Sequence, residues 1–361
     1  MAAAQEHPGR RPTWAVVIPA YNEADRIGDA LRTLREQTEP ADEIVVVDDG
    51  SEDDLDAAVA GYRDMVEVIR QPNGGLAAAR NTGGAAIDSE WVLFLDADDW
   101  LAPNFLAALR DTVAAAPALD IVATDALGID DAHGEVLYRH YERVGFAHRE
   151  QRLAILDHNF TLTGVSVRRR AWEDAGRFDE TMQVCEDWEC WSRMILRGSR
   201  AGLAADTVLY RRHHGGNMSS DRFVMLAGRL EVLRRSLARD DLSRRERATA
   251  RRSVRTNRRA LRMLEARRIL AAWVAQAYLD AGSAPVHEAP APADHAVPDR
   301  SAATRLLAKR GTPLRLRGAL LIGLLHPRLA ARLLRDRPRY ALSAEPVDVS
   351  AGSVGEARTG G

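Results

Sequence analysis

The stretch that decides the fold is Trp91-Val92-Leu93-Phe94-Leu95-Asp96-Ala97-Asp98-Asp99, in which an apolar run leads straight into carboxylates. Such a run predicts a buried strand, and the acids then lie at its carboxyl end. Successive strand side chains point to opposite sides, so Asp96 and Asp98 share one side while Asp99 points elsewhere or caps the next helix. Because Mg²⁺ and Mn²⁺ prefer oxygen ligands, the motif predicts a divalent-cation site. The competing interpretation is a plain acidic turn with a helix cap.

The same design occurs twice earlier in the chain. Val16-Val17-Ile18-Pro19-Ala20-Tyr21-Asn22-Glu23 and Ile44-Val45-Val46-Val47-Asp48-Asp49-Gly50-Ser51 both place polar side chains directly after an apolar strand. The segment from Asn73 to Gly83 is a glycine turn that leads into a helix of small residues carrying Arg80. In open α/β sheets, ligands bind in the crevice at the carboxyl ends of the strands. We therefore expect these segments to converge on one ligand site.

Strand-like runs alternate with helix-like stretches through the first half of the chain. This alternation is typical of an α/β fold with a mostly parallel central sheet flanked by helices. The expected strands are Trp14 to Ile18, Glu43 to Val47, Val66 to Ile69, Trp91 to Leu95 and Asp120 to Thr124. From residue 125 to 150 the pattern dissolves, which indicates a partly antiparallel or irregular region over the site.

These segments, in this order and followed by Glu186-Asp187, resemble the family 2 glycosyltransferases over about residues 14 to 220. The resemblance implies a glycosyltransferase A fold with a Rossmann-like nucleotide-binding half. It also implies transfer of a sugar from a nucleotide-diphosphate sugar to an acceptor hydroxyl, with inversion at the sugar carbon. The chain would then be an enzyme of the hexosyltransferase type that uses Mn²⁺ or Mg²⁺.

The resemblance assigns the donor to the first strand ends. A carboxylate that accepts a hydrogen bond from the base suits the imino proton of uracil, so a UDP-sugar is the favoured donor. Residues Pro19, Ala20 and Tyr21 would flank the base, Glu23 would reach the ribose, Asp49 would accept from the base, Arg80 would contact the base or a phosphate, and Asp96 would contact the ribose or the metal shell.

The same resemblance assigns the reacting groups. Asp98 would ligate the cation that stabilises the departing diphosphate. Asp187 is the candidate general base for the acceptor hydroxyl and Glu186 is the adjacent alternative, although an acid at this position can also be a plain helix cap. In the later segment from Tyr210 to Ser219, counting from Tyr210 selects His213 as the residue that approaches the metal, and counting back from Asn217 selects His214.

Charge and motifs weigh against other functions. Residues 1–221 hold 22 basic and 39 acidic side chains, and residues 222–361 hold 28 and 13. An acidic first half argues against a nucleic-acid enzyme, because binding to phosphates needs a basic face. The first loop lacks the Gly-rich basic sequence of a nucleotidyltransferase and the Gly-x-Gly-x-x-Gly of a dinucleotide oxidoreductase. A non-catalytic protein that binds a sugar nucleotide, or serves as a scaffold, remains the alternative.

The chain is expected to consist of a catalytic domain and a basic extension. Arginines interleaved with leucines after residue 222 indicate amphipathic helices, which either pack on protein or lie on an anionic lipid surface. The apolar core from Gly318 to Leu325 is shorter than the roughly 20 residues of a membrane span. The predicted parts are a flexible segment 1–12, a catalytic domain 13–221 (nucleotide-sugar and metal half 13–125, acceptor half 126–221), an Arg-rich helical region 222–281, an Ala/Pro linker 282–300, a basic amphipathic helical segment 301–342 and a disordered tail 343–361.

The cysteines and the N-terminal residues bear on the compartment. Cys185 and Cys190 match neither a zinc nor a redox motif, so reduced thiols are expected. No export signal is apparent in the polar segment 1–12, which favours a cytoplasmic protein, with peripheral contact to the inner face of a membrane through the basic tail. Saccharide, lipid-linked and small-molecule acceptors all stay open.

Overall fold

The computed structural model describes residues 11–161, 164–280, 300–308 and 320–321. These residues form two compact units. The first comprises residues 1–221 and 231–251, and the second comprises residues 222–230 and 252–361. Residues 1–10 of the predicted flexible segment, 282–299 of the Ala/Pro linker, 309–319 and 322–342 of the basic amphipathic segment, and the whole tail 343–361 lie outside the described part. The subdivision of the chain into domains stays a prediction.

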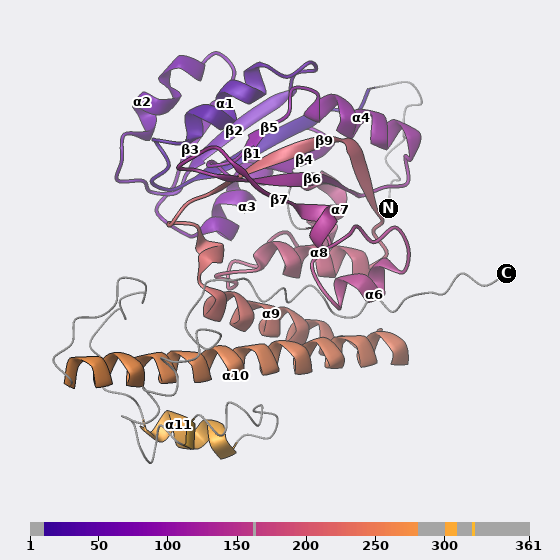
Figure 1. The fold of residues 1–361 in the computed structure, drawn as a ribbon. Coiled ribbons are helices and arrows are strands. Elements are labelled where there is room, and N and C mark those ends of the chain that lie inside the picture. The colour runs from indigo at the N-terminus through magenta and orange to yellow at the C-terminus, as the bar shows by residue number, and fades with distance from the viewer. Residues whose placement is uncertain (1–10, 162–163, 281–299, 309–319, 322–361) are drawn as a thin grey trace. The chain divides into compact units, whose positions relative to one another are not determined.

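The first unit is built on a nine-stranded mixed sheet (Figure 1). The strand order is β3-β2-β1-β4-β8-β6-β9-β5, and β7 pairs with β6 off this path. The strands are β1 Trp14–Ala20, β2 Glu43–Asp48, β3 Glu67–Arg70, β4 Trp91–Phe94, β5 Trp100–Leu101, β6 Ile121–Asp130, β7 Val136–Arg139, β8 Ser166–Arg168 and β9 Ala201–His213. All five predicted strands are confirmed. The sheet is parallel from β3 to β4 and mixed beyond β4, where β8 runs antiparallel to both β4 and β6.

The parallel pairing brings the motifs together at one edge of the sheet. Ala20 of β1 is paired with Asp48 of β2, and Val17 is paired with Phe94 of β4. The pairing continues past the strand ends, because the Asp49 N–H donates to the Ala20 carbonyl over 2.9 Å. Strand ends that are in register place their following residues side by side. The three polar segments therefore meet at the carboxyl edge, as the sequence predicts.

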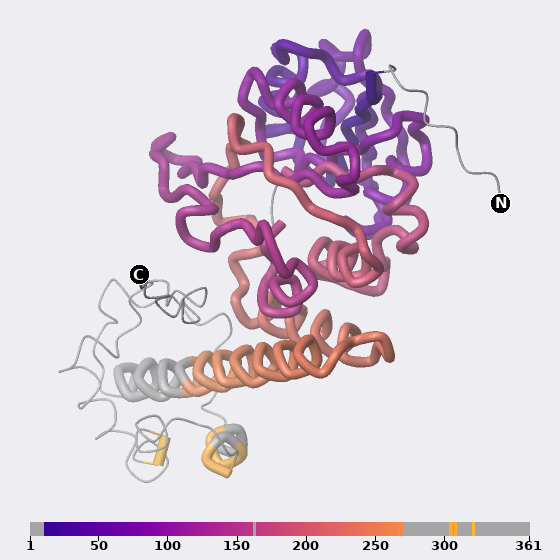
Figure 2. Tube along the Cα trace, turned by 90° about the vertical axis from the view of Figure 1, so that its right-hand side faces the viewer, coloured from indigo at the N-terminus to yellow at the C-terminus, as the bar shows by residue number. Residues whose placement is uncertain are grey.

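Helices cover both faces of this sheet. They are α1 Ile27–Arg35, α2 Leu55–Val59, α3 Leu76–Ala86, α4 Phe105–Ala115, α5 His140–Arg143, α6 Gln151–Ile155, α7 Arg169–Ala175 and α8 Glu186–Leu196, with 3-10 turns at Ala60–Tyr62 and Met218–Ser220. In Figure 1, α1, α2 and α4 lie on one face, and α3, α7 and α8 lie on the other. Figure 2 shows the segment around β7 and α5 standing out from one side of the unit.

Side chains of β1 pack into the hydrophobic cores on both faces of the sheet, which explains why the strand is apolar throughout. Val16 and Ile18 belong to one hydrophobic cluster with Leu31 of α1. On the opposite face, a methyl group added at Gly83 of α3 would collide with Val17. Gly83 therefore permits a close approach of α3 to the sheet. This approach places Arg80, one turn earlier, below the carboxyl edge.

The basic extension contains long helices. They are α9 Arg222–Leu237, α10 Arg244–Asp280 and α11 Arg300–Ala308. Two of them occupy the stretch from 222 to 270, where the sequence indicates two amphipathic helices. Within the described ranges, no helix is both long enough and apolar enough to cross a bilayer.

Candidate active site

Three carboxylates gather after β4. One oxygen from each of Asp96, Asp98 and Asp99 lies within 4.8 Å of the others. Burial, and then the charge of Asp96, raise the pKa of Asp98, whereas its hydrogen bond to His214 acts in the opposite direction. Burial and the neighbouring acids raise the pKa of Asp99 still further. Confined like charges of this kind are relieved by a bound cation, and the all-oxygen donor set suits Mg²⁺ or Mn²⁺.

Asp99 has a different environment from the other two acids. It is buried, and its Oδ1 accepts the backbone N–H of Arg212 over 3.0 Å. The Arg212 side chain donates to the Asp98 carbonyl and pairs with Asp29 and Asp131. Asp99 therefore ties β9 to the acid motif. Asp96 and Asp98 are the more exposed pair, as strand alternation predicts.

The two histidines at the end of β9 face different partners. The Nε2 atom of His214 lies 3.1 Å from Asp98 Oδ2, and the Asn217 amide nitrogen lies 3.1 Å from the same oxygen. His213, by contrast, lies 2.6 Å from the Tyr138 hydroxyl through its Nε2. Of the two candidates left open by the sequence, the structure brings His214 to the acid cluster. A metal-binding role for either histidine stays a prediction.

Arg80 links the acid cluster to helix α8. Its Nη2 lies 2.7 Å from Asp96 Oδ1, and its Nη1 lies 2.6 Å from Glu186 Oε1. The side chains of Arg80 and Glu186 are only 8% and 7% exposed. The observed partners of Arg80 are thus carboxylates, and its predicted contact with a base or phosphate stays a prediction. Glu186 is committed to this ion pair, and the choice between Asp187 and Glu186 as general base stays a prediction.

The buried pair predicts a large effect on stability. Replacing Arg80 with methionine leaves the Glu186 charge buried without a partner, which should lower the free energy of unfolding by about 3–5 kcal/mol. Denaturant titration measures this loss. The matched control is Arg170→Met, because the Arg170–Asp174 pair is exposed and 3.9 Å apart, and the control should change stability by less than about 0.5 kcal/mol. Equal losses of unfolding free energy in Arg80→Met and Arg170→Met would refute the conclusion that Arg80 stabilises the fold by pairing with the buried Glu186.

Asp187 lies in the first turn of α8. Cys185, the residue directly before α8, has a φ of 59°, a left-handed conformation that costs energy outside glycine and often occurs at functional sites. The Asp187 carboxylate accepts the Trp188 N–H over 2.6 Å and the Asn159 amide over 3.1 Å. Burial, and then the charge of Glu186, raise the pKa of Asp187 to about 7. A group with this pKa can accept or release a proton near neutral pH.

The predicted nucleotide residues lie along the ends of β1 and β2. Pro19 and Ala20 are buried, whereas Tyr21 is 46% exposed. Burial raises the pKa of Glu23, which also feels the charges of Asp98 and His214. Glu23 is therefore close enough to the acid cluster for the charge of Asp98 to shift its pKa. The contacts of these residues with a nucleotide stay predictions.

Asp49 is held by the start of α3. Its two oxygens accept the N–H groups of Gly74 and Gly75 over 2.9 and 2.8 Å, and the Gln71 amide over 2.7 Å. These three bonds fix the loop that precedes Arg80. A carboxylate offers about four acceptor positions, so one further bond is available for the predicted contact with a base.

With this geometry described, the chain can be compared with known proteins. The sequence model for glycosyl transferase family 2 matches residues 15–176. Residues 15–176 belong to glycosyl transferase family 2. The matched segment contains Asp49, Arg80 and the acid cluster, and it ends before Glu186, Asp187 and His214.

Curated relatives are similar to a longer part of the chain. It is 32% identical over 202 residues to the succinoglycan biosynthesis protein ExoU of Rhizobium meliloti, a match that covers 51% of this chain and 57% of ExoU. The chain thus spans little more than half the length of this relative. Among solved structures, TarS 1–349 of S. aureus in complex with UDP-GlcNAc has a TM-score of 0.57 at 19% identity, covering 91% of both chains. The mannosyltransferase PcManGT from Pyrobaculum calidifontis, in complex with GDP-Man and Mn²⁺, has a TM-score of 0.55 at 20% identity, covering 91% of this chain and 88% of PcManGT. These structures confirm the glycosyltransferase A fold.

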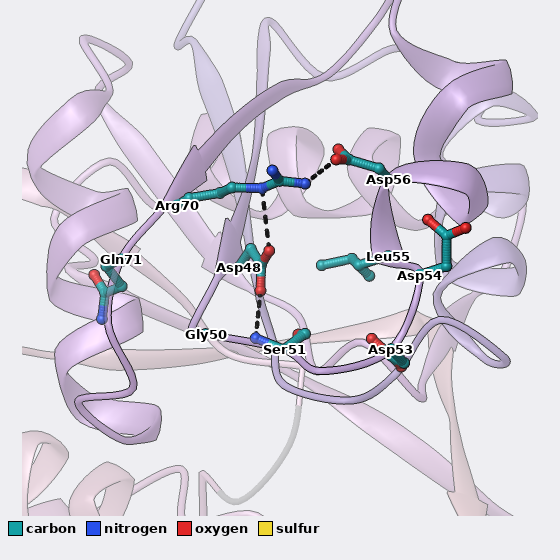
Figure 3. Close-up of a pocket in the computed structure, with 9 residues that line it drawn as sticks. All are labelled: Asp48, Gly50, Ser51, Asp53, Asp54, Leu55, Asp56, Arg70 and Gln71. Carbon is teal, nitrogen blue, oxygen red and sulfur yellow. Dashed lines mark hydrogen bonds and ion pairs between the residues drawn. The ribbon is translucent and has the colours of Figure 1, made fainter.

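A hollow of about 280 Å³ lies beside the segment from Asp48 to Ser51 at the end of β2 (Figure 3). Asp48 points into it, where its carboxylate accepts the Ser51 N–H and pairs with Arg70. Arg70 also pairs with Asp56. Asp48 and Asp49 therefore serve opposite sides of β2, the first stabilising the β2–β3 edge and the second the start of α3.

Sequence reasoning missed some of these residues. Asn159, which donates to Asp187, lies 28 positions away from it in a loop without a recognisable motif. In the sequence, Asn217 serves only as a position from which the histidines are counted. In the structure its amide donates a hydrogen bond to Asp98. A pattern search finds neither contact, because each depends on tertiary packing.

Proposed function

We propose that this chain is a metal-dependent, inverting glycosyltransferase that moves a hexosyl group from a nucleotide-diphosphate sugar to an acceptor hydroxyl. The observation that carries the proposal is the buried Arg80, which joins Asp96 of the acid cluster to Glu186, the neighbour of Asp187. Leaving-group stabilisation and proton removal must act on opposite sides of one sugar carbon. Groups suited to these two tasks are joined here through a single side chain.

The chemistry follows from the positions of these groups. A divalent cation bound to Asp98 and Asp96 would supply positive charge to the departing diphosphate. Asp187 takes the proton of the acceptor hydroxyl as the new bond forms between that oxygen and the anomeric carbon. The bond from this carbon to the diphosphate oxygen breaks on the opposite side, so the configuration inverts. The pKa of about 7 keeps much of Asp187 ionised at neutral pH and still basic enough to act.

The donor is proposed to lie along Pro19, Ala20 and Tyr21, with Asp49 and Glu23 nearby. A UDP-sugar is favoured by the carboxylate at Asp49. Proteins of the same fold are described with UDP-GlcNAc and with GDP-Man and Mn²⁺, so both kinds of base belong in the test.

The acceptor and the place of action are less constrained by the site. A saccharide, free or lipid-linked, is the proposed acceptor, because ExoU is named for succinoglycan biosynthesis. We place the reaction in the cytoplasm, because neither Cys185 nor Cys190 forms a disulfide. Exposed Arg251, Arg255 and Arg258 share one face of α10, which fits peripheral contact with anionic lipid. Failure to sediment with phosphatidylglycerol vesicles would remove this contact from the proposal.

Turnover tests the proposed function. UDP-glucose, UDP-galactose, UDP-GlcNAc and GDP-mannose are each incubated with the full chain, Mn²⁺ and a saccharide panel, and nucleoside diphosphate release is measured. We expect release from at least one donor, an increase on adding the acceptor and loss on adding EDTA. Donor binding without release under any of these conditions would instead support a non-catalytic sugar-nucleotide protein.

A further inference from the structure

The Asp187 carboxylate is held by one side chain from outside its own helix. Asn159, which is 9% exposed, donates its amide hydrogen to Asp187 Oδ2 over 3.1 Å. The other oxygen, Oδ1, accepts the N–H of Trp188. The carboxylate is thus fixed at both oxygens, and each oxygen keeps lone-pair capacity.

A second residue fixes which way the Asn159 amide faces. The N–H of Thr161 lies 3.3 Å from Asn159 Oδ1, and the Thr161 hydroxyl lies 3.0 Å from the same atom. A backbone N–H can only donate, so the atom that it meets must be the amide oxygen. The NH₂ group then has to face Asp187. Thr161 is fully buried, so this arrangement is shielded from water.

We propose that Asn159, oriented by Thr161, is the positioning residue that aims Asp187 at the acceptor hydroxyl. The inference rests on the proposed role of Asp187 as general base. A carboxylate in the first turn of a helix can rotate about two side-chain bonds, and a misaimed base loses much of its effect. The Asn159–Asp187 bond restricts this rotation.

The chemical nature of asparagine suits the task. Arginine or lysine at this position would stabilise the carboxylate with a full charge and weaken it as a base. Asparagine supplies one hydrogen bond without a charge. The ionisable groups whose charges shift the pKa of Asp187 are Glu186, Arg80 and Asp96. The charge of Asp187 in turn raises the pKa of Cys190. None of these groups donates a hydrogen bond to Asp187, so Asn159 is its side-chain donor among the described residues.

The first test needs no substrate. The Asp187 carboxyl is titrated by ¹³C NMR in protein labelled at aspartate, with its signal assigned from Asp187→Asn. The Asn159 hydrogen bond favours the ionised form, so Asn159→Ala should raise the Asp187 pKa by about 0.5–1 pH unit. Thr161→Val should raise it by less, and Thr161→Ser, which keeps the hydroxyl, should raise it least. An unchanged Asp187 titration in both Asn159→Ala and Thr161→Val would overturn the proposal.

The second test is kinetic and uses whichever of the four nucleotide sugars turns over in the wild type with Mn²⁺. Asn159→Ala should lower kcat by about 10–100-fold, up to the loss that a small misplacement of a catalytic group causes, with KM for the donor changed less than about twofold. Thr161→Val should lower kcat less, and should add nothing to Asn159→Ala, since both act through one contact.

A matched pair controls for general packing effects. The Asn104 amide donates to the Asp206 carbonyl, and its oxygen accepts the Thr207 hydroxyl over 3.1 Å. Asn104→Ala and Thr207→Val should leave both the Asp187 titration and kcat unchanged. An equal fall in kcat in the two pairs would reduce Asn159 to a packing residue. If the wild type shows no turnover, the proposed function fails, and the NMR titration still decides whether Asn159 holds Asp187.

Discussion

Replacing Asp187 with asparagine is expected to lower kcat by about 10³-fold, within the range that a general base contributes. The change is nearly isosteric, and the amide can still accept from Trp188 N–H through its oxygen. The change removes the ability to take a proton from the acceptor, and it also removes the oxygen that accepts from the Asn159 amide. The affinity for the nucleotide sugar should stay close to that of the wild type, because none of the predicted donor residues belongs to α8.

The neighbouring acid provides the discriminating comparison. Glu186→Gln breaks the ion pair with Arg80, so it should reduce the free energy of unfolding more than Asp187→Asn does. If Asp187 is the base, the kcat of folded Glu186→Gln should exceed that of Asp187→Asn. The reverse order of kcat values would transfer the catalytic role to Glu186.

The pH dependence of kcat follows from the same group. The pKa of Asp187 is raised to about 7, and a base works only when deprotonated. Activity should therefore be present above pH 7 and decline as the pH falls through about 7. The acid limb should disappear from the residual activity of Asp187→Asn. A limb that persists there belongs to a different group.

Replacing Asp98 is expected to remove Mn²⁺-dependent turnover, with a loss of about 10³-fold, comparable to losing a main electrostatic stabiliser of the transition state. Asp98 also anchors the loop after β9 through His214 and Asn217. Alanine would lose both functions, so Asp98→Asn is the sharper variant. Its amide oxygen still accepts a hydrogen bond but carries no charge for a cation.

The measurement compares Mn²⁺ binding and nucleoside diphosphate release in the two variants. Both should lose Mn²⁺-stimulated release, and both should bind Mn²⁺ more weakly by electron paramagnetic resonance. Asp111, which is exposed on α4, provides the control, and Asp111→Ala should behave as the wild type. If Asp98→Asn keeps the stimulation by Mn²⁺ and only Asp98→Ala loses it, Asp98 anchors the loop and does not hold the metal.

The sequence was most informative where strands are buried on both faces. Strands β1, β2 and β4 are nearly uniform apolar runs because helices cover both sides of the sheet. Acids that follow such runs stand out. The second half of the sheet was harder to predict. Strand β9 alternates irregularly between buried and exposed positions and has an irregular register with β6 near Thr124 and Asp125.

The doubled histidine shows the same limit at the level of single residues. His213 is the last residue of β9 and His214 follows it, and the two side chains meet different partners, Tyr138 and Asp98. Which one meets Asp98 depends on the register of β9 against its neighbours, and the sequence does not encode this register locally. The ion pair between Arg80 and Glu186 joins positions 106 apart, so it too appears only in the fold.

The configuration of the product tests the central claim most directly, namely a single displacement in which Asp187 deprotonates the acceptor while the diphosphate leaves on the opposite side. NMR of the first product formed from an α-linked nucleotide sugar gives the anomeric configuration from the one-bond coupling constant between C1 and H1. We predict a β-linked product, that is, inversion at this carbon. An α-linked product would contradict the account, because retention requires a different arrangement of reacting groups.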